Sequence, residues 1–131
     1  MAPVAEVKRI LIVDDSEVFC QTWRKFLETR YPGRVAVESF LDPVAALREV
    51  RPDIALLLVD LEMPVVDGKK FLEFAASRGV DRRRAVIVSA RDAEDLHRIF
   101  PSGDCLAVIN KEDPPQQAAF LMILDSVMRK P

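Results

Sequence analysis

The chain has 131 residues, 50% of them hydrophobic and 31% charged, which predicts one domain over residues 1–131 with its core at about 7–129. The 19 basic and 21 acidic side chains give a net charge of −2, so the composition does not indicate direct binding to nucleic acid. The longest apolar run, residues 118–124, is too short to cross a bilayer, and the N-terminus lacks a secretory signal pattern. Two cysteines cannot form a disulfide framework, and we therefore expect a cytoplasmic protein without membrane insertion.

The first half of the chain alternates between strand and helix patterns. Residues 7–13, which are apolar and largely β-branched apart from Lys8 and Arg9, predict a strand that ends at Asp14. A helix is expected from Ser16, its N-cap, to the Tyr-Pro-Gly stop at 31–33. Residues 34–40 alternate with period two and predict a strand with one exposed side, after which Asp42 and Pro43 begin a short helix that ends near residues 51–52. The first helix is predicted to have an apolar face of Val18, Phe19, Trp23, Phe26 and Leu27.

The second half continues the same alternation. Residues 53–59, continuously apolar after Asp53, predict a strand that is buried on both faces and ends at Asp60. A helix is expected from residues 67–68, and residues 85–88 predict another buried strand that ends at Ser89. A helix over 93–100, a strand over 105–109 and a last helix from 113–115 complete the pattern. The two long helices of this half are predicted to bury Phe71, Leu72, Phe74 and Ala75, and Phe120, Leu121, Leu124, Val127 and Met128.

Five successive strand-then-helix units predict an α/β fold. Strict alternation with short connections favours a parallel sheet with right-handed crossovers and helices on both faces. We therefore expect a flavodoxin-like, doubly wound (βα)5 domain whose five parallel strands have the order 2-1-3-4-5. In this order the first and third strands are neighbours.

Polar residues stand where the apolar strands end, namely Asp14, Asp15, Asp60, Ser89 and Lys111. Functional groups of open α/β sheets gather at the carboxyl ends of the strands, so we expect these side chains to lie close together. Three clustered carboxylates raise one another's pKa unless a cation lies among them, and oxygen ligands favour Mg²⁺ or Mn²⁺. A carboxylate nucleophile with a hard metal ion, an ammonium group and a hydroxyl group predicts a phosphoryl-transfer site.

The segments 11–16 (LIVDDS), 59–64 (VDLEMP) with 67–68 (DG), 88–90 (VSA) and 110–111 (NK) resemble the receiver domain of two-component response regulators. The resemblance covers essentially the whole chain. It implies that a histidine kinase or a histidine phosphotransfer protein donates a phosphoryl group, and that phosphorylation changes binding to a downstream protein or a fused output domain. It also implies a homodimer through the face formed by helix 4, strand 5 and helix 5, and no enzymatic activity beyond the domain's own phosphorylation and dephosphorylation.

The resemblance assigns roles to the acidic residues. Asp60 is similar to the phosphoacceptor and would also bind the metal ion. Asp15 would bind the metal directly, Asp14 would bind it through water, and Glu62 would contribute its backbone carbonyl group.

The remaining site residues follow from the same resemblance. Ser89 is similar to the switch hydroxyl group and Lys111 to the lysine that pairs with the phosphoryl group. Glu62 and Arg91, two positions after Asp60 and Ser89, would flank the site and set the lifetime of the phosphoryl group. We expect their opposite charges to pair across the mouth of the site and to slow hydrolysis; the alternative is that Glu62 stays free and orients the attacking water.

Two positions depart from the family pattern. Glu112 follows Lys111 where the family usually has proline in a cis bond, so the resemblance does not predict the geometry of this loop. Val108 stands where the family usually has the aromatic partner of the switch hydroxyl group. We therefore expect a modest change on phosphorylation, carried by the loop of Ser89 and by helix 4.

Other functions remain as alternatives. An aspartate-nucleophile phosphohydrolase on a similar fold would need a second acid two positions after Asp14, where this chain has Ser16. A degenerate receiver that serves only as a docking module is the third hypothesis. We expect His97 on the surface and the two cysteines, Cys20 and Cys105, to be buried as small apolar residues.

Overall fold

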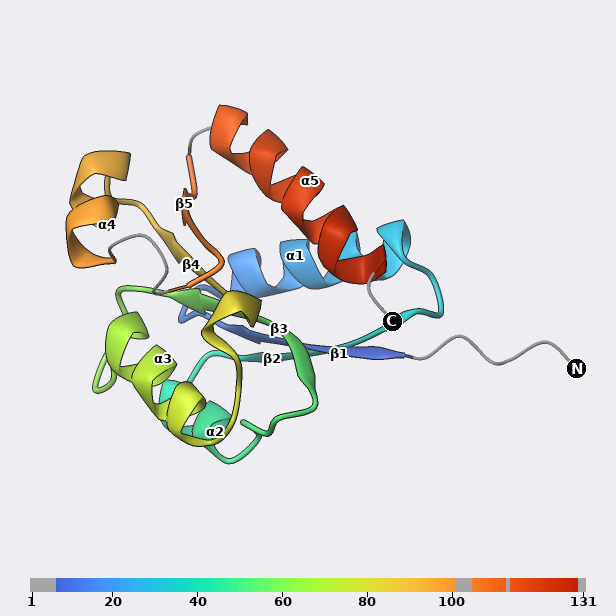
Figure 1. The fold of residues 1–131 in the computed structure, drawn as a ribbon, viewed down its shortest axis with the longest axis horizontal. Helices are drawn as coiled ribbons and strands as arrows, with labels where there is room; N and C mark the ends of the chain where they lie inside the picture. Colours follow the sequence, from blue (N-terminus) through green and yellow to red (C-terminus); the bar gives the residue numbers. More distant parts are fainter. Residues whose placement is uncertain (1–6, 101–104, 113, 130–131) are drawn as a thin grey trace, which may run out of the picture.

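A computed structural model describes residues 7–100, 105–112 and 114–129, without the side chains of residues 93, 97 and 114–117 (Figure 1). The strands are β1 (Lys8–Val13), β2 (Val35–Phe40), β3 (Ile54–Asp60), β4 (Ala85–Ser89) and β5 (Ala107–Asn110). The α-helices are α1 (Glu17–Arg30), α2 (Pro43–Leu47), α3 (Gly68–Ser77), α4 (Ala93–Ile99) and α5 (Pro114–Arg129), and one 3-10 turn, η1 (Arg82–Arg84), precedes β4. The predictions for the side chain of His97 and for Asp113 concern positions outside this description.

The five strands form one parallel sheet in the order β2-β1-β3-β4-β5, which confirms the predicted topology. Val13 at the end of β1 pairs with Val59, and Asp60 at the end of β3 pairs with Val88. The carboxyl ends of neighbouring strands therefore lie side by side. This edge of the sheet places the residues that follow each strand within reach of one another.

Helices cover both faces of the sheet, and each face has its own hydrophobic core (Figure 1). One core contains Ile10 and Ile12 of β1 together with residues of α1 and α5. The other core contains Leu11 and Val13 of the same strand together with residues of α2, α3 and α4. Successive side chains of a strand point to opposite faces, so a strand between two helical layers must be apolar throughout. This explains the uninterrupted apolar runs of β1, β3 and β4.

The helices begin at the polar residues that the sequence suggests. The side chains of Ser16, Asp42 and Asp67 accept backbone N–H bonds at the start of α1, α2 and α3. Asp92 does the same for α4. Each cap satisfies an N–H group that has no partner within its helix, so the loops at this edge lead directly into ordered helices. No helix of the described residues is long and apolar enough to cross a membrane.

Three local expectations were wrong. Val18 is exposed, because two positions along a helix differ by about 200° and Cys20 is the residue that faces the sheet. Helix α2 ends at Leu47 rather than near residue 51, because the chain turns so that Val50 is buried and Glu49 reaches Arg9. Strand β5 begins at Ala107 rather than at residue 105, and residues 105–106 form a bend.

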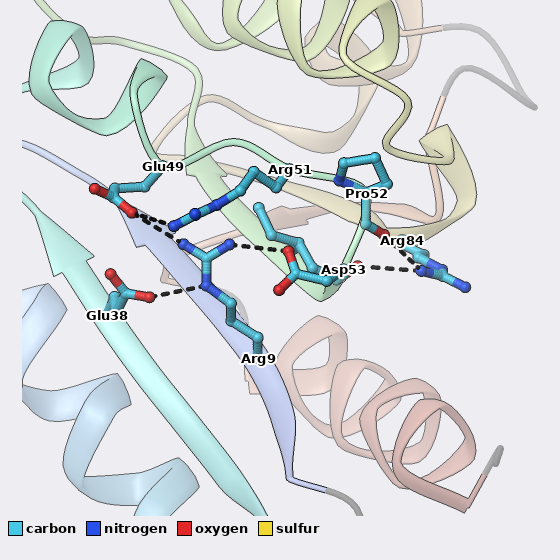
Figure 2. A network of polar contacts seen from close by, with 8 residues as sticks. Arg9, Glu38, Glu49, Arg51, Pro52, Asp53 and Arg84 are labelled. Atoms are coloured by element: carbon cyan, nitrogen blue, oxygen red, sulfur yellow. Dashed lines mark hydrogen bonds and ion pairs between the residues drawn. The ribbon is translucent and has the colours of Figure 1, made fainter.

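A group of ion pairs lies near the amino end of β1, where Arg9 contacts three carboxylates (Figure 2). We call Arg9, Glu38, Glu49 and Asp53 the Arg9 cluster. The guanidinium nitrogens lie 2.9, 3.3 and 3.1 Å from the carboxylate oxygens of Glu38, Glu49 and Asp53, respectively. Burial lowers the pKa of Arg9, but the hydrogen bonds and charges of Glu38 and Asp53 outweigh it and raise the pKa above its usual value. The cluster therefore joins β1 and β2 to the segment between α2 and β3.

Candidate functional site

Three carboxylates meet at the carboxyl edge of the sheet, as the predicted strand order requires. Asp14 and Asp15 follow β1, and Asp60 ends β3. One carboxylate oxygen from each of the three lies within 4.8 Å of the other two. Asp14 and Asp60 are buried, whereas Asp15 is exposed at the rim. We call these three residues the acidic cluster.

Lys111, the residue after β5, supplies a positive charge to the acidic cluster. Its Nζ lies 2.7 Å from Asp14 Oδ2 and 3.5 Å from Asp60 Oδ2. The ammonium group also lies 4.4 Å from the centre of the Phe19 ring on α1. Burial alone would lower the pKa of Lys111, but its pairing with Asp14 and Asp60 raises that pKa above its usual value. Lys111 is therefore a permanent cation at the base of the cluster.

One lysine does not balance the cluster fully. Burial raises the pKa of Asp60 to about 6, and the charge of Asp14 adds to this effect, although Lys111 opposes it. Asp60 Oδ1 also accepts a hydrogen bond of 3.2 Å from the Glu62 backbone N–H. A carboxylate held in this environment gains from any further positive charge that approaches it.

The acidic cluster has the composition that a hard divalent cation requires. All three donors are carboxylate oxygens, which favour Mg²⁺ or Mn²⁺ over zinc. Asp14 Oδ2 is buried and, apart from its ion pair with Lys111, has no hydrogen-bond partner among the described residues. The exposed position of Asp15 leaves the cluster open to solvent on one side. The cluster could therefore bind a metal ion without a change in the fold.

Ser89 is buried at the end of β4, and its hydroxyl group is already engaged. Ser89 Oγ donates to Glu62 Oε1 at 2.9 Å and accepts from the Arg91 backbone N–H at 3.0 Å. Arg91 Nε donates to the same Glu62 oxygen at 3.0 Å, so the expected Glu62–Arg91 pair is present. The hydrogen bond to Ser89, followed by the pairing with Arg91, lowers the pKa of Glu62. The pair between Ser89 and Glu62 was not predicted, because residues 27 positions apart show no shared pattern in the sequence.

The mouth of the site is a depression of about 520 Å³ whose lining includes Asp15, Glu62 and Arg91. Gly68, at the start of α3, packs closely against the end of β3: its N–H donates to Leu61 O at 2.8 Å, and a Cβ there would lie 2.6 Å from Asp60 O. Only glycine fits this close approach. Val65, in the same loop, is exposed and has a φ of 71°. A β-branched residue in this conformation is strained.

The loop after β5 differs from the family pattern, and Asn110, the last residue of β5, makes contacts with it that were not predicted. All peptide bonds between described residues are trans, including that between Lys111 and Glu112. Asn110 donates to Arg91 O at 2.8 Å and accepts from Glu112 N–H at 2.7 Å. Val108, in β5, is partly buried. The position of Asn110 beside Lys111 was the only signal in the sequence that could have pointed to it.

Comparisons with known proteins agree with this geometry. Residues 10–119 match the family model of the response regulator receiver domain. A protein-glutamate methylesterase/protein-glutamine glutaminase of Rhodospirillum rubrum is 38% identical over 97 residues, which are 72% of this chain and 26% of that protein. A protein of the same name from Xanthomonas campestris is 44% identical over 68 residues, which are 50% of this chain and 18% of that protein. The chain thus spans about a quarter or less of these relatives, and the activities in their names are not carried over to it.

Solved structures share the fold at lower identity. The non-phosphorylated HemR receiver domain of Leptospira biflexa has a TM-score of 0.74 and 24% identity, and the match covers 95% of this chain and 96% of that one. A CheY-like receiver domain of Methanospirillum hungatei has a TM-score of 0.73 and 22% identity over 93% and 94% of the two chains. Strand order, the acidic cluster with Lys111, and the family match lead to one conclusion. The chain belongs to the receiver domain family of response regulators.

Proposed function

We propose that Asp60 accepts a phosphoryl group in the presence of Mg²⁺ or Mn²⁺ and that this modification changes partner binding. The observation that carries the proposal is the position of Lys111, whose ammonium group lies within ion-pair distance of both buried aspartates. A buried acid cluster with a single cation disfavours its own charge. It would gain from a metal ion, whose positive charge would also offset the additional negative charge that an acyl phosphate on Asp60 carries.

The residues of the site would divide the reaction as follows. A carboxylate oxygen of Asp60 forms the new bond to phosphorus, while the bond between phosphorus and the donor's leaving group breaks and that group departs with its electron pair. Lys111 pairs with a phosphoryl oxygen. Asp14, Asp15 and Asp60, with the backbone carbonyl group of Glu62, would hold the metal ion, with Asp14 acting through water. When bound, the ion supplies positive charge that stabilises the phosphoryl oxygens.

Ser89 would have to change partner for the switch to operate. Its hydroxyl group donates to Glu62 in the structure, so contact with a phosphoryl oxygen requires that this bond break. Release of Ser89 leaves Glu62 with Arg91 alone. The retained pair would cover the mouth and slow the entry of water, since even about 1.4 kcal/mol in the barrier is tenfold in rate. Arg91→Ala should therefore speed dephosphorylation, whereas an unchanged or slower rate would exclude this gate.

The partners follow from the family and belong to the same proposal. A histidine kinase or histidine phosphotransfer protein would phosphorylate Asp60 in the cytoplasm. The receptor of the signal would be a separate downstream protein or an output domain fused to this one, with a homodimer through α4, β5 and α5 as a further arrangement. The domain would turn over no substrate other than its own phosphoryl group. A small-ester phosphatase assay distinguishes this proposal from a phosphohydrolase.

Acetyl phosphate with Mg²⁺ tests the assignment of Asp60. Intact-mass measurement should show one added phosphoryl group on the wild type and on Asp53→Asn, a matched change in the Arg9 cluster, and none on Asp60→Asn. Labelling of Asp60→Asn at the wild-type level would overturn the assignment. No labelling of the wild type by acetyl phosphate or by a kinase would favour the docking module.

The metal site has a test that does not require phosphorylation. Mg²⁺ binds the native state in preference to the unfolded chain and should raise the melting temperature of the wild type. Asp15→Ala should lose most of this rise, because Asp15 is proposed to bind the ion. Since Asp15 is exposed, its removal should leave the core intact. Glu49→Ala, in the Arg9 cluster, should keep the full rise. A wild-type response in Asp15→Ala would place the metal elsewhere.

A further inference from the structure

Asn110, the last residue of β5, uses both ends of its side-chain amide to connect two loops. Its Nδ2 donates to the backbone carbonyl of Arg91, in the loop between β4 and α4, at 2.8 Å. Its Oδ1 accepts from the backbone N–H of Glu112, in the loop between β5 and α5, at 2.7 Å. A carboxamide carries a donor and an acceptor on one rigid plane, which neither aspartate nor serine can reproduce at this reach.

The same two loops carry the residues proposed to contact the phosphoryl group. The Lys111 backbone N–H donates to Ser89 O at 2.9 Å, so the residue that carries the ammonium group is anchored on the residue that carries the hydroxyl group. Arg91 N–H in turn donates to Ser89 Oγ at 3.0 Å. Asn110 therefore closes a ring of hydrogen bonds that leads from Ser89 through Arg91 to the segment of Lys111 and Glu112.

Glu112 makes this arrangement possible. Proline has no backbone N–H and could not donate to Asn110 Oδ1. The departure from the family pattern at residue 112 thus coincides with a bond that the usual residue could not form. Val108, the other departure, has no ring that could change its position when Ser89 moves. The described contacts offer the Asn110 amide as another connection between these loops.

We propose that Asn110 is a positioning residue that couples the loop of Ser89 and Arg91 to the loop of Lys111 and Glu112. A displacement of Ser89 moves the Arg91 backbone, the Arg91 carbonyl moves the Asn110 amide, and the amide moves the Glu112 backbone at the entry to α5. The role in signalling rests on the proposed phosphorylation of Asp60. The coupling itself exists in the unphosphorylated protein and is measured there.

Two substitutions separate the halves of the amide. Asn110→Asp keeps an acceptor for the Glu112 N–H but removes the donor to Arg91 O, whereas Asn110→Ala removes both. Gln21→Ala is the matched control, because it also removes an amide that makes a surface hydrogen bond, in this case to Glu17 on α1. In each background, Ser89→Ala serves as the perturbation, and the backbone amide of Glu112 is observed by ¹H–¹⁵N NMR.

The wild-type and Gln21→Ala backgrounds should show a clear shift of the Glu112 amide on Ser89→Ala. The Asn110→Asp and Asn110→Ala backgrounds should show less than half of that shift. Absence of the shift in the wild type, or equal shifts in all backgrounds, would overturn the proposal. Asn110→Ala keeps the experiment decisive if the new carboxylate of Asn110→Asp disturbs folding.

Beryllofluoride, a phosphoryl mimic, adds the functional arm. In the wild type it should shift the amides of both loops, and in Asn110→Ala it should still shift those near Ser89 while the response at Glu112 falls. If acetyl phosphate and beryllofluoride have no effect on the wild type, the proposed function fails. The Ser89→Ala comparison would still decide the coupling by itself.

Discussion

Arg9 near the amino end of β1 and Lys111 after β5 each contact more than one carboxylate, but burial is reversed between the two groups. In the Arg9 cluster the cation is the more protected partner: its side chain is 13% exposed, and those of Glu38 and Asp53 are 42% and 65% exposed. In the acidic cluster the side chains of Asp14 and Asp60 are 0% and 7% exposed, and that of Lys111 is 20% exposed. Water therefore hydrates the acids of the Arg9 cluster, whereas Asp14 and Asp60 are largely shielded from water.

This difference separates a group of ion pairs that water and Arg9 already neutralise from a group that favours a further positive charge. Carboxylates that reach water need no further counter-ion, and the Arg9 cluster holds three segments together without a need for one (Figure 2). Buried carboxylates without full compensation destabilise the fold and favour a metal ion or a change of charge. The same residue types thus connect three segments at one edge of the sheet and form a buried, incompletely neutralised acid pair at the other.

Backbone strain follows the same division. Gly33 and Gly79, in loops at the amino edge, have φ values of 71° and 94°, which glycine adopts without penalty. Among the described residues at the carboxyl edge, the one with positive φ is Val65, five positions after Asp60. Strained backbone is characteristic of functional loops, where the surrounding structure maintains it.

The largest expected difference in stability is between the variants that remove the central cation of each group. Lys111→Met leaves two buried carboxylates without their counter-ion and should lower the free energy of unfolding by about 3 kcal/mol or more. Arg9→Met keeps the apolar stem and leaves acids that water can hydrate, so the loss should be about 1 kcal/mol. Urea unfolding at pH 7.5 in EDTA measures both. A larger loss for Arg9→Met would contradict the comparison.

Removal of one acid at each edge should change the free energy of unfolding in opposite directions. Burial and Asp14 hold the pKa of Asp60 at about 6, so its charge at pH 7.5 destabilises the fold, and Asp60→Asn should raise the free energy of unfolding by about 2 kcal/mol. Glu38→Gln removes a partner of Arg9 and should lower it by up to about 1 kcal/mol. The same titration in EDTA compares them. Changes of equal sign would remove the distinction between the edges.

Relief of strain should stabilise only the carboxyl edge. Asparagine tolerates positive φ better than valine, and little packing is lost in Val65→Asn because Val65 is exposed. We therefore expect the free energy of unfolding to rise by about 1 kcal/mol. Gly33→Ala should lose about 1 kcal/mol, because its φ of 71° disfavours a Cβ although no atom obstructs it. Thermal unfolding of both variants tests the pair. A loss in Val65→Asn would show that the valine side chain has contacts of its own.

The smallest effect depends on pH and concerns the ion pair between Arg30 at the end of α1 and Asp125 on α5. Hydrogen bonds from Arg30 and then from Tyr31 hold the pKa of Asp125 at about 2, below its unfolded value. A depressed pKa stabilises the fold above the unfolded pKa, and this contribution is lost as the pH falls from about 4 to about 2. Asp125→Asn should therefore be less stable than the wild type at pH 7 and approach it in acid. The difference between Gln21→Ala and the wild type should stay constant, and a constant difference for Asp125→Asn would contradict the assignment.

The sequence predicted the features that depend on periodicity and strand ends. The topology and the meeting of Asp14 and Asp60 follow from alternation and from the parallel order, and both are confirmed. The Glu62–Arg91 pair was expected from the resemblance to the receiver family, at positions two after Asp60 and two after Ser89, and it is present. These relations need no knowledge of side-chain conformation.

Contacts that depend on loop geometry escaped prediction. The bond from Ser89 to Glu62 and the bridge made by Asn110 each require a backbone path that the sequence does not encode locally. The Arg9 cluster was missed because its members lie on three separate segments and none of them ends an apolar run. Val18 shows the reverse error, since an apolar residue near a helix start was assigned to the buried face.

The aromatic residues beside Lys111 give the protein a built-in optical probe. Trp23 is the single tryptophan of the chain, and its ring centroid lies 6.1 Å from that of Phe19 and 5.2 Å from that of Phe120. The Lys111 ammonium group in turn lies 4.4 Å from the centroid of the Phe19 ring. Phe19, Trp23 and Lys111 line a groove of about 500 Å³ that reaches α5. A movement of Lys111 on metal binding or phosphorylation would change the surroundings of Phe19 and, through it, the emission of Trp23. Fluorescence of the unlabelled protein is therefore a further way to follow the metal and phosphorylation tests proposed above.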